Sequence, residues 1–152
     1  MAEHIWTVVC ERHLVDPSSQ IITLVDMIES IYEDGLELRL EEALGAGKRG
    51  AYLNLSMQLV SWWYRNDPQE ERLNVRFTVL NPAGVSVIEQ TAEPEWTGEA
   101  AHLRVFVLFE KFPVTMLGLH WFLVQHLKPA KKGEPKWERV TRIPLAVEPP
   151  RK

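Results

Sequence analysis

The chain has 152 residues, of which 45% are hydrophobic and 25% are charged, so its length and composition are those of one globular domain. Its net charge of −4 argues against a nucleic-acid partner, and its single cysteine, Cys10, excludes a disulfide framework or a multi-cysteine metal cluster. No basic segment precedes an apolar one near Met1, and no uninterrupted apolar run reaches about 18 residues, so we expect a cytoplasmic protein without a membrane partner.

Ten prolines and eight glycines divide the chain into segments of roughly 8–12 residues, the spacing of a β-sandwich or barrel. The apolar segment His4–Leu14 predicts the first strand. It ends at Asp16–Ser19, where an aspartate before proline and two serines indicate a turn. Gln20–Ile31 is rich in Ile, Val and Thr and predicts the returning strand of a hairpin. Ile28 and Ile31, three residues apart, leave a helix open for its second half.

The next segment predicts one short helix near residues 35–44. Asp34 and Glu37 have the spacing of a capping box, and apolar residues recur on one helical face at positions 36, 40, 43 and 44. Gly45 stands where a helix end favours a residue with positive φ. The alternative is a strand through the alternating leucines at 36, 38 and 40.

Three segments in the middle of the chain alternate apolar and polar residues, as half-buried strands do: 53–59, 73–79 and 103–109. The turn Asn81–Gly84, with proline second and glycine fourth, joins the strand over 73–79 to a returning strand over 85–91. This hairpin indicates antiparallel pairing of neighbouring strands.

Gly118–Leu127 is apolar on both faces, which is typical of a central strand, although periodicity alone leaves a short buried helix open. Trp137–Val147 predicts the last strand, and Pro144 within it indicates an edge position or a bulge, because proline lacks an N–H donor. About eight strands and one short helix together predict a mainly all-β fold, an antiparallel two-sheet β-sandwich. We expect a single domain over residues 1–148 and a disordered tail over 149–152.

Five motifs in the second half of the chain occur in a recognisable order. They are Leu59–Asp67 (LVSWWYRND), Asn81–Gly84 (NPAG), Phe112–Val114 (FPV), Gly118–Phe122 (GLHWF) and Arg142–Val147 (RIPLAV). This order, over about residues 50–148, resembles a family of small uncharacterised bacterial β-sandwich proteins, a domain of unknown function. The resemblance implies a sandwich of immunoglobulin- or C2-like outline, and it implies no activity.

No group of residues forms a recognisable catalytic or metal-binding pattern. Cys10 and His13 are three residues apart, so on a strand they point to opposite faces. His120 and His126 share a strand face but would lie about 20 Å apart at roughly 3.3 Å per residue, too far to bind one metal ion. The glycine-rich segment 45–50 lacks the spacing and the hydroxyl residue of a phosphate-binding loop. We therefore expect no enzyme activity, no catalytic residues, no metal and no cofactor.

Six tryptophans are the unusual feature of the composition. In the phase set by the strand over 53–59, Trp63 faces the core, whereas Trp62 and Tyr64 lie on the solvent face. With the neighbouring Arg65 they predict a binding patch, because Trp, Tyr and Arg dominate the energetics of protein interfaces. The alternative is that the predicted helix folds over this face and buries both rings.

These observations lead to three hypotheses of different classes. The first is a non-enzymatic interaction or structural module that uses the surface aromatic patch to bind an unknown protein partner or a second copy of itself. The second is a small-ligand or carbohydrate-binding β-sandwich that uses the same rings. The third is a hydrolase whose site is assembled across strands and is therefore not readable from the sequence.

Overall fold

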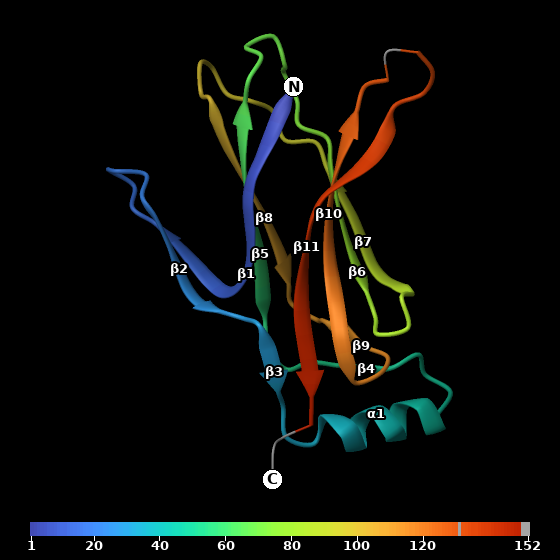
Figure 1. Ribbon diagram of the computed structural model, residues 1–152. Coiled ribbons are helices and arrows are strands. Elements are labelled where there is room, and N and C mark those ends of the chain that lie inside the picture. Colours follow the sequence, from blue (N-terminus) through green and yellow to red (C-terminus); the bar gives the residue numbers. More distant parts are fainter. Residues whose placement is uncertain (131, 150–152) are drawn as a thin grey trace.

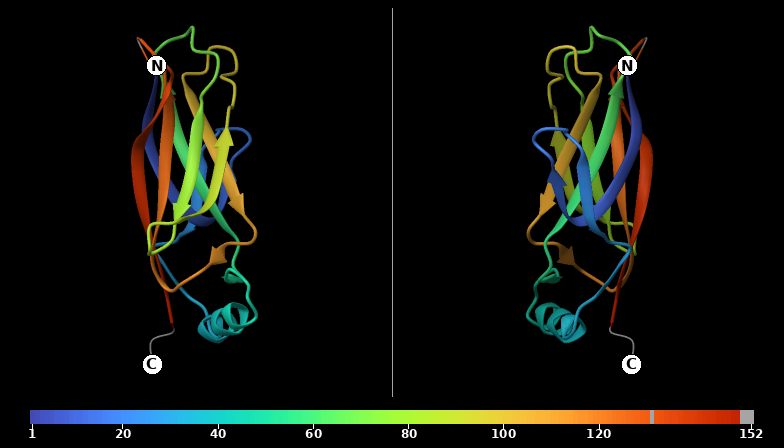
Figure 2. Two further views of the ribbon diagram at one scale, coloured as in Figure 1. Left: turned by 90° about the vertical axis from the view of Figure 1, so that its right-hand side faces the viewer. Right: turned by 90° about the vertical axis from the view of Figure 1, so that its left-hand side faces the viewer.

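Two β-sheets pack face to face in the computed structural model, which describes residues 1–130 and 132–149, and a helix lies at one end of them (Figure 1). The two turned views each look onto the face of one sheet, with the helix and the first residues at opposite ends (Figure 2). This architecture confirms the predicted mainly β sandwich with one short helix. Residues 150–152, most of the predicted tail, lie outside the described residues.

The first sheet contains four antiparallel strands in the order β2-β1-β5-β8. Their bounds are Ala2–Val15 (β1), Ile22–Met27 (β2), Met57–Arg65 (β5) and His102–Phe109 (β8). β8 pairs with β5 over all 8 of its residues without a shift in register, and it forms one edge of this sheet.

The second sheet contains five strands in the order β3-β11-β10-β6-β7. Their bounds are Ser30–Tyr32 (β3), Val75–Leu80 (β6), Ser86–Ala92 (β7), Gly118–Lys128 (β10) and Lys136–Glu148 (β11). β10 lies between β11 and β6, which confirms its predicted central position. β3 pairs in parallel with only the last residues of β11, Ala146–Glu148, so Pro144 lies at an open edge, as predicted.

Three short elements lie near one end of the sandwich. β4 (Ala51–Tyr52) and β9 (Pro113–Val114) form a two-stranded pair, and α1 covers Leu36–Gly45. The described residues thus form eleven strands, against about eight predicted. β3, β4 and β9 have two or three residues each, too few for alternation to reveal them. No helix in the described part of the chain is long and apolar enough to cross a membrane.

The hydrophobic core lies between the two sheets and is built from alternate residues of their strands. Met57, Leu59 and Trp63 of β5 are fully buried, and they share this core with Phe77 of β6 and Phe122 of β10. Burial of each such side chain stabilises the fold by about 1.5–3 kcal/mol, so the alternation along β5 fixes which of its faces turns inward.

The single strand predicted over 20–31 is wrong, because this segment divides into β2 and β3, which belong to different sheets. Asp26 has a φ of 51°, in the left-handed region, and this bends the chain at the end of β2. Ile28 then donates its N–H to the carbonyl oxygen of Val9 at 2.8 Å before the chain crosses to β11. A bend at a residue other than glycine or proline has no clear sequence signal.

The predicted cap at the start of α1 is also wrong. The N-cap residue is Gly35, with a φ of 75°, and no side chain caps the helix, so Asp34 does not have the predicted role. Glu33 anchors this end instead. Its carboxylate pairs with Arg39 and accepts the backbone N–H of Asn54 at 2.9 Å.

Two further boundaries are displaced from their predicted positions. The helix includes Gly45, and the positive φ falls at Gly47, with a value of 75°. The strand predicted from position 53 begins at Met57. Leu53 is buried but donates its N–H to the carbonyl oxygen of Phe112 at 3.0 Å, outside either main sheet. The alternation of apolar and polar residues therefore begins four residues before the hydrogen-bonded strand does.

Candidate functional site

Four aromatic side chains gather on the outer face of the first sheet, the face that turns away from the core. Trp62 and Tyr64 belong to β5, which is flanked by β1 and β8. β1 contributes Trp6 and β8 contributes His102. Ring centroids lie 5.7 Å apart for Trp6 and Trp62, and His102 lies 5.1 Å from Trp62 and 5.2 Å from Tyr64. We refer to these four residues as the aromatic face.

The helix does not cover the aromatic face. α1 lies at the lower end of the molecule in Figure 1, whereas the end of β5 that carries Trp62 and Tyr64 lies at the upper end. The alternative that the helix buries both rings is therefore wrong. Both rings are half-buried because they pack against Trp6 and His102, and His102 itself is exposed.

The ring of Trp62 is held by its neighbours on two sides. Its plane is tilted by 58° to that of Trp6 and by 33° to that of His102. Its indole Nε1 is buried without a hydrogen-bond partner. Because both neighbours lie close to the ring, Trp62 does not offer the open, flat surface on which a sugar ring would stack.

The structure does not bring the third predicted patch residue, Arg65, to this face. Its guanidinium donates to the carbonyl oxygens of Glu70 at 3.2 Å and Gly98 at 2.9 Å, and it lies 5.5 Å from the ring centre of Trp96. Side chains alternate along a strand, so Arg65 falls in the inward phase of Trp63. Its role in the structure is to tie together two loops at the end of the sandwich.

The distal part of the β1–β2 hairpin, residues 11–27, bends over the outer face of the first sheet, and we refer to it as the arm. The ring of His13 stacks on that of Phe106 with centroids 4.0 Å apart, and its Nδ1 is hydrogen-bonded to Gln58. Arg104 donates to the carbonyl oxygen of Gln20 at 3.1 Å, near the tip of the hairpin. The arm therefore extends from β1 across β5 to β8.

Cys10 and His13 form no nucleophile–base pair. Cys10 is fully buried, and burial raises the pKa of its thiol, which lowers the fraction of reactive thiolate. His13 bonds Gln58 instead. His120 and His126 are both buried on β10, and the Nε2 atom of His120 is buried without a hydrogen-bond partner. Among the residues that the structure describes, no group of three or more His, Cys, Asp or Glu side chains could hold a metal ion.

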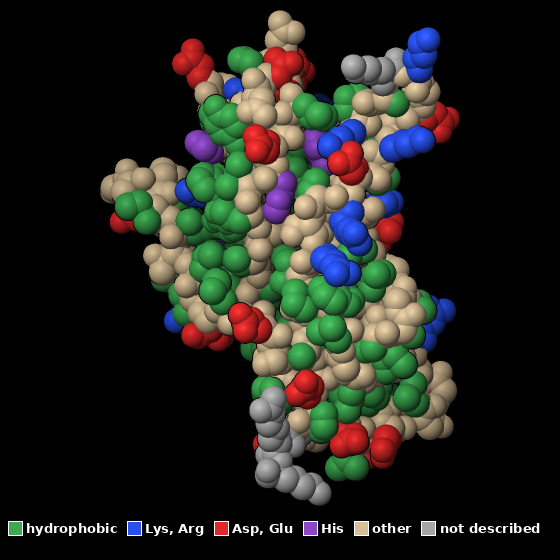
Figure 3. Space-filling view, in the orientation of Figure 1, with side chains coloured by type: hydrophobic (Ala, Val, Ile, Leu, Met, Phe, Trp, Pro, Cys, Tyr) green, Lys and Arg blue, Asp and Glu red, His purple; other side chains and the backbone are tan. Residues whose placement is uncertain are grey.

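Apolar side chains remain exposed on the same side of the molecule. Phe106 and Leu108, on the outer face of β8, are 41% and 51% exposed. Leu14 and Ile21 of the arm are also exposed. Figure 3 shows hydrophobic side chains gathered over β1 and β2, and lysine and arginine side chains beside further hydrophobic ones over β10 and β11.

A pocket of 500 Å³ adjoins the aromatic face at Tyr64. Its walls come from the end of β5 and from the loop before β8, and they include Arg65, the third predicted binding residue, together with Asn66 and Glu99. Polar groups around one aromatic ring are the usual lining of a small-ligand site. This pocket is the feature that favours the ligand-binding alternative.

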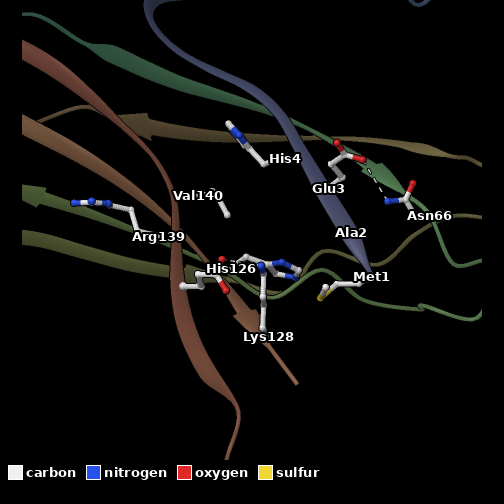
Figure 4. Close-up of a pocket in the computed structure, with 10 residues that line it drawn as sticks. Met1, Ala2, Glu3, His4, Asn66, His126, Lys128, Arg139 and Val140 are labelled. Carbon is white, nitrogen blue, oxygen red and sulfur yellow. Dashed lines mark hydrogen bonds and ion pairs between the residues drawn. The ribbon is translucent and has the colours of Figure 1, made fainter. Parts of the chain in front are cut away.

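A second pocket, of 540 Å³, opens between the start of β1 and the ends of β10 and β11 (Figure 4). His4 and His126 line it, and each makes an edge-to-face contact with Trp63, with ring centroids 5.1 and 5.4 Å apart. Burial lowers the pKa of both imidazoles. Lys128 and Glu138 form an ion pair of 2.8 Å at this pocket, so opposite charges there are matched.

A comparison of this chain with protein-family models, curated proteins and solved structures finds no match. The resemblance drawn from the order of the motifs therefore stays a prediction.

The sequence pattern predicts two of the four residues of the aromatic face, Trp62 and Tyr64, but not their surroundings. Alternation over 103–109 predicts one buried phase, yet the other phase contains Phe106 and Leu108, which are also apolar. When such a strand is buried on one face only, the apolar residues of its other face are exposed. The apolar residues in the second phase were therefore a sequence signal for an exposed apolar surface. The contribution of Trp6 and His102 could not be found, because it depends on strand order.

Proposed function

We propose that this protein is a non-enzymatic interaction module that binds a protein partner, or a second copy of itself, through the aromatic face. The observation that supports this proposal most directly is the chain of four rings, each in contact with the next and half-buried or exposed, at the end of the sheet away from the helix. Trp and Tyr are enriched where interface energy concentrates, since they bury a large area with few rotatable bonds.

The packing of the rings against one another favours a protein partner over a carbohydrate. Trp62 is wedged between Trp6 and His102, so a partner would meet the exposed margin of a packed aromatic cluster. Phe106 and Leu108 extend this surface with apolar area. An apolar centre of this kind, bordered by polar groups, is typical of protein interfaces. We also propose a cytoplasmic location in a bacterium, which the composition and the motif order predict.

The alternative is a small-ligand or carbohydrate site at the 500 Å³ pocket beside Tyr64. A titration of the purified chain with glycans and metabolites, followed by tryptophan fluorescence, tests it, because Trp62 lies in the same cluster. A saturable change that is lost in Tyr64→Ala would support this alternative. A flat response across the panel would contradict it.

Affinity capture from a lysate of the native host tests the main proposal. The tagged wild-type chain is compared with the double variant Trp62→Ala/Tyr64→Ala and with a matched control, Trp137→Ala/Tyr52→Ala. The control removes the same two ring types from other elements. Trp137 is half-buried, and Tyr52 is 56% exposed. Circular dichroism and thermal melting establish that each variant folds.

We expect one protein in near-stoichiometric amount with the wild type and the control, and its loss with Trp62→Ala/Tyr64→Ala. The recovered protein is then purified and titrated against both variants, so that direct binding is measured. Equal binding by the two double variants, or no stoichiometric protein with any of them and no self-association, would contradict the proposal.

A further inference from the structure

The outer edge of β8 lacks the features with which proteins protect exposed sheet edges. A free strand edge carries unpaired N–H and C=O groups that can pair with another chain, and lysines, prolines and bulges normally prevent this. β8 contains neither lysine nor proline, and Arg104 is its single Asp, Glu, Lys or Arg residue. Its pairing with β5 is regular over its whole length, so no bulge interrupts the strand.

The other edges of the two main sheets, in the described part of the chain, each carry such a feature. β7 carries Glu89, and its pairing with β6 has a register shift. The open part of β11 contains Pro144 and, before it, charged residues such as Arg139 and Arg142. β2 ends at the left-handed Asp26, and the first half of β1 has a register shift between His4 and Trp6. β3 has only 3 residues.

The arm does not occupy the β8 edge. It reaches β8 over the outer face, through the ring contact of His13 with Phe106 and the bond from Arg104 to the carbonyl oxygen of Gln20. Within the described residues no backbone hydrogen bond joins the arm to β8. The backbone groups on the outer edge of β8 are therefore left for another chain.

We infer that two copies of this chain join along β8. Their β8 strands pair antiparallel about a two-fold axis, and the two four-stranded sheets become one continuous sheet. This inference rests on the proposed function, because it names the partner as a second copy and the contact as the strand beside the aromatic face.

The sequence of β8 is complementary to itself in this arrangement. In a continuous sheet, residues that face outward on one strand lie opposite residues that face outward on the other. The two-fold axis therefore passes between the two copies of a single residue, and we name each register by that residue. An axis through Val105 places Arg104 opposite Phe106 of the second copy, and an axis through Phe106 places it opposite Leu108. In both registers a cation meets an aromatic or apolar side chain, and no two like charges are opposed.

Sedimentation equilibrium of the purified full chain, with the variant Phe106→Lys, tests this inference. The new lysine would face Arg104 in one register and a second lysine in the other, and opposed like charges weaken association. We expect the wild type to be dimeric and the dimer Kd to rise about 100-fold in Phe106→Lys. Leu108→Lys, at a side chain that is 51% exposed, is the second variant: its lysine faces Arg104 when the axis passes through Phe106 and His102 when it passes through Val105, so it distinguishes the two registers.

Two control variants distinguish a charge on the β8 edge from the loss of a ring contact and from a charge added elsewhere. His13→Ala removes the same ring contact with Phe106 but places no charge on β8. Leu119→Lys adds the same charge to a leucine of β10 that is 43% exposed. Both are expected to remain dimers. Hydrogen exchange supplies a second readout, since the amides of β8 should become more protected as protein concentration rises.

A monomeric wild type, or a dimer that persists in both Phe106→Lys and Leu108→Lys, would overturn the inference. A dimer that is lost in Trp62→Ala/Tyr64→Ala but kept in both lysine variants would also overturn it, while leaving the aromatic face as the interaction site. A dimer that depends on β8, together with partner binding that is unaffected by Trp62→Ala/Tyr64→Ala, would support the inference and contradict the proposed role of the aromatic face.

Discussion

The ring of His13 stacks on the ring of Phe106, with centroids 4.0 Å and planes 16° apart, and this contact ties the arm to the edge strand β8. The contact joins β1 to β8 over the outer face of the intervening β5, and His13 lies on the part of β1 that pairs with β2. The arm thereby covers Cys10 and Val60, both outward-facing and both fully buried.

We predict that His13→Ala loosens the arm without unfolding the domain. The variant loses a stacked pair worth about 1 kcal/mol, while the core between the sheets is unchanged. Hydrogen exchange at residues 16–21 should become faster, and the urea midpoint should fall only slightly. Leu14→Ala, at a neighbouring side chain that is 55% exposed, is the control and should leave exchange unchanged. Equal exchange rates in His13→Ala and the wild type would show that the ring contact does not hold the arm.

We predict a large loss of stability in Trp63→Ala. The side chain is fully buried and packs between His4 and His126, so truncation leaves a cavity and should cost about 4 kcal/mol. Trp137→Ala is the matched control. Trp137 is half-buried beneath the guanidinium of Arg76, 4.7 Å from its ring centre, and its loss should cost about 1 kcal/mol. Urea denaturation followed by circular dichroism measures both. Similar costs for the two variants would contradict the assignment of Trp63 to the core.

We predict that stability falls as pH decreases below about 6.5. Burial lowers the pKa of His4, His120 and His126 from the model-compound value of 6.5, so each binds a proton more readily in the unfolded chain. Their stabilising effect is therefore complete above that pH and is lost progressively below it. Urea denaturation at pH 7.5, 6.5 and 5.5 checks this trend. His120→Asn should reduce the slope of stability against pH, and an unchanged slope would exclude a contribution from His120.

We predict opposite effects for alanine at two glycines around the helix. A Cβ at Gly50 would lie 2.2 Å from the carbonyl oxygen of Val114, so Gly50→Ala must displace backbone and should destabilise the fold by more than about 1 kcal/mol. A Cβ at Gly45, in the last turn of α1, meets nothing within 4 Å. Gly45→Ala should therefore stabilise the protein by up to about 1 kcal/mol. Thermal melting of both variants tests the pair, and a shift in the same direction for both would contradict it.

Part of the site could be predicted from the strand pattern. Alternation along β5 placed Trp63 inside and Trp62 and Tyr64 outside, as the structure shows. The same rule, applied one residue further, would have placed Arg65 in the inward phase. The lateral neighbours of Trp62 could not be predicted, because Trp6 and His102 reach it through strand pairing across long stretches of sequence.

The mainly β class, most strand positions and the inward face of most strands follow from local patterns, because side-chain alternation is a local property and hydrophobic burial acts on it directly. The order β2-β1-β5-β8, the division of residues 20–31 between two sheets and the position of the arm are visible only in the folded chain. These features depend on contacts between distant residues, such as His13 with Phe106, and no local pattern encodes which distant partner a strand will meet.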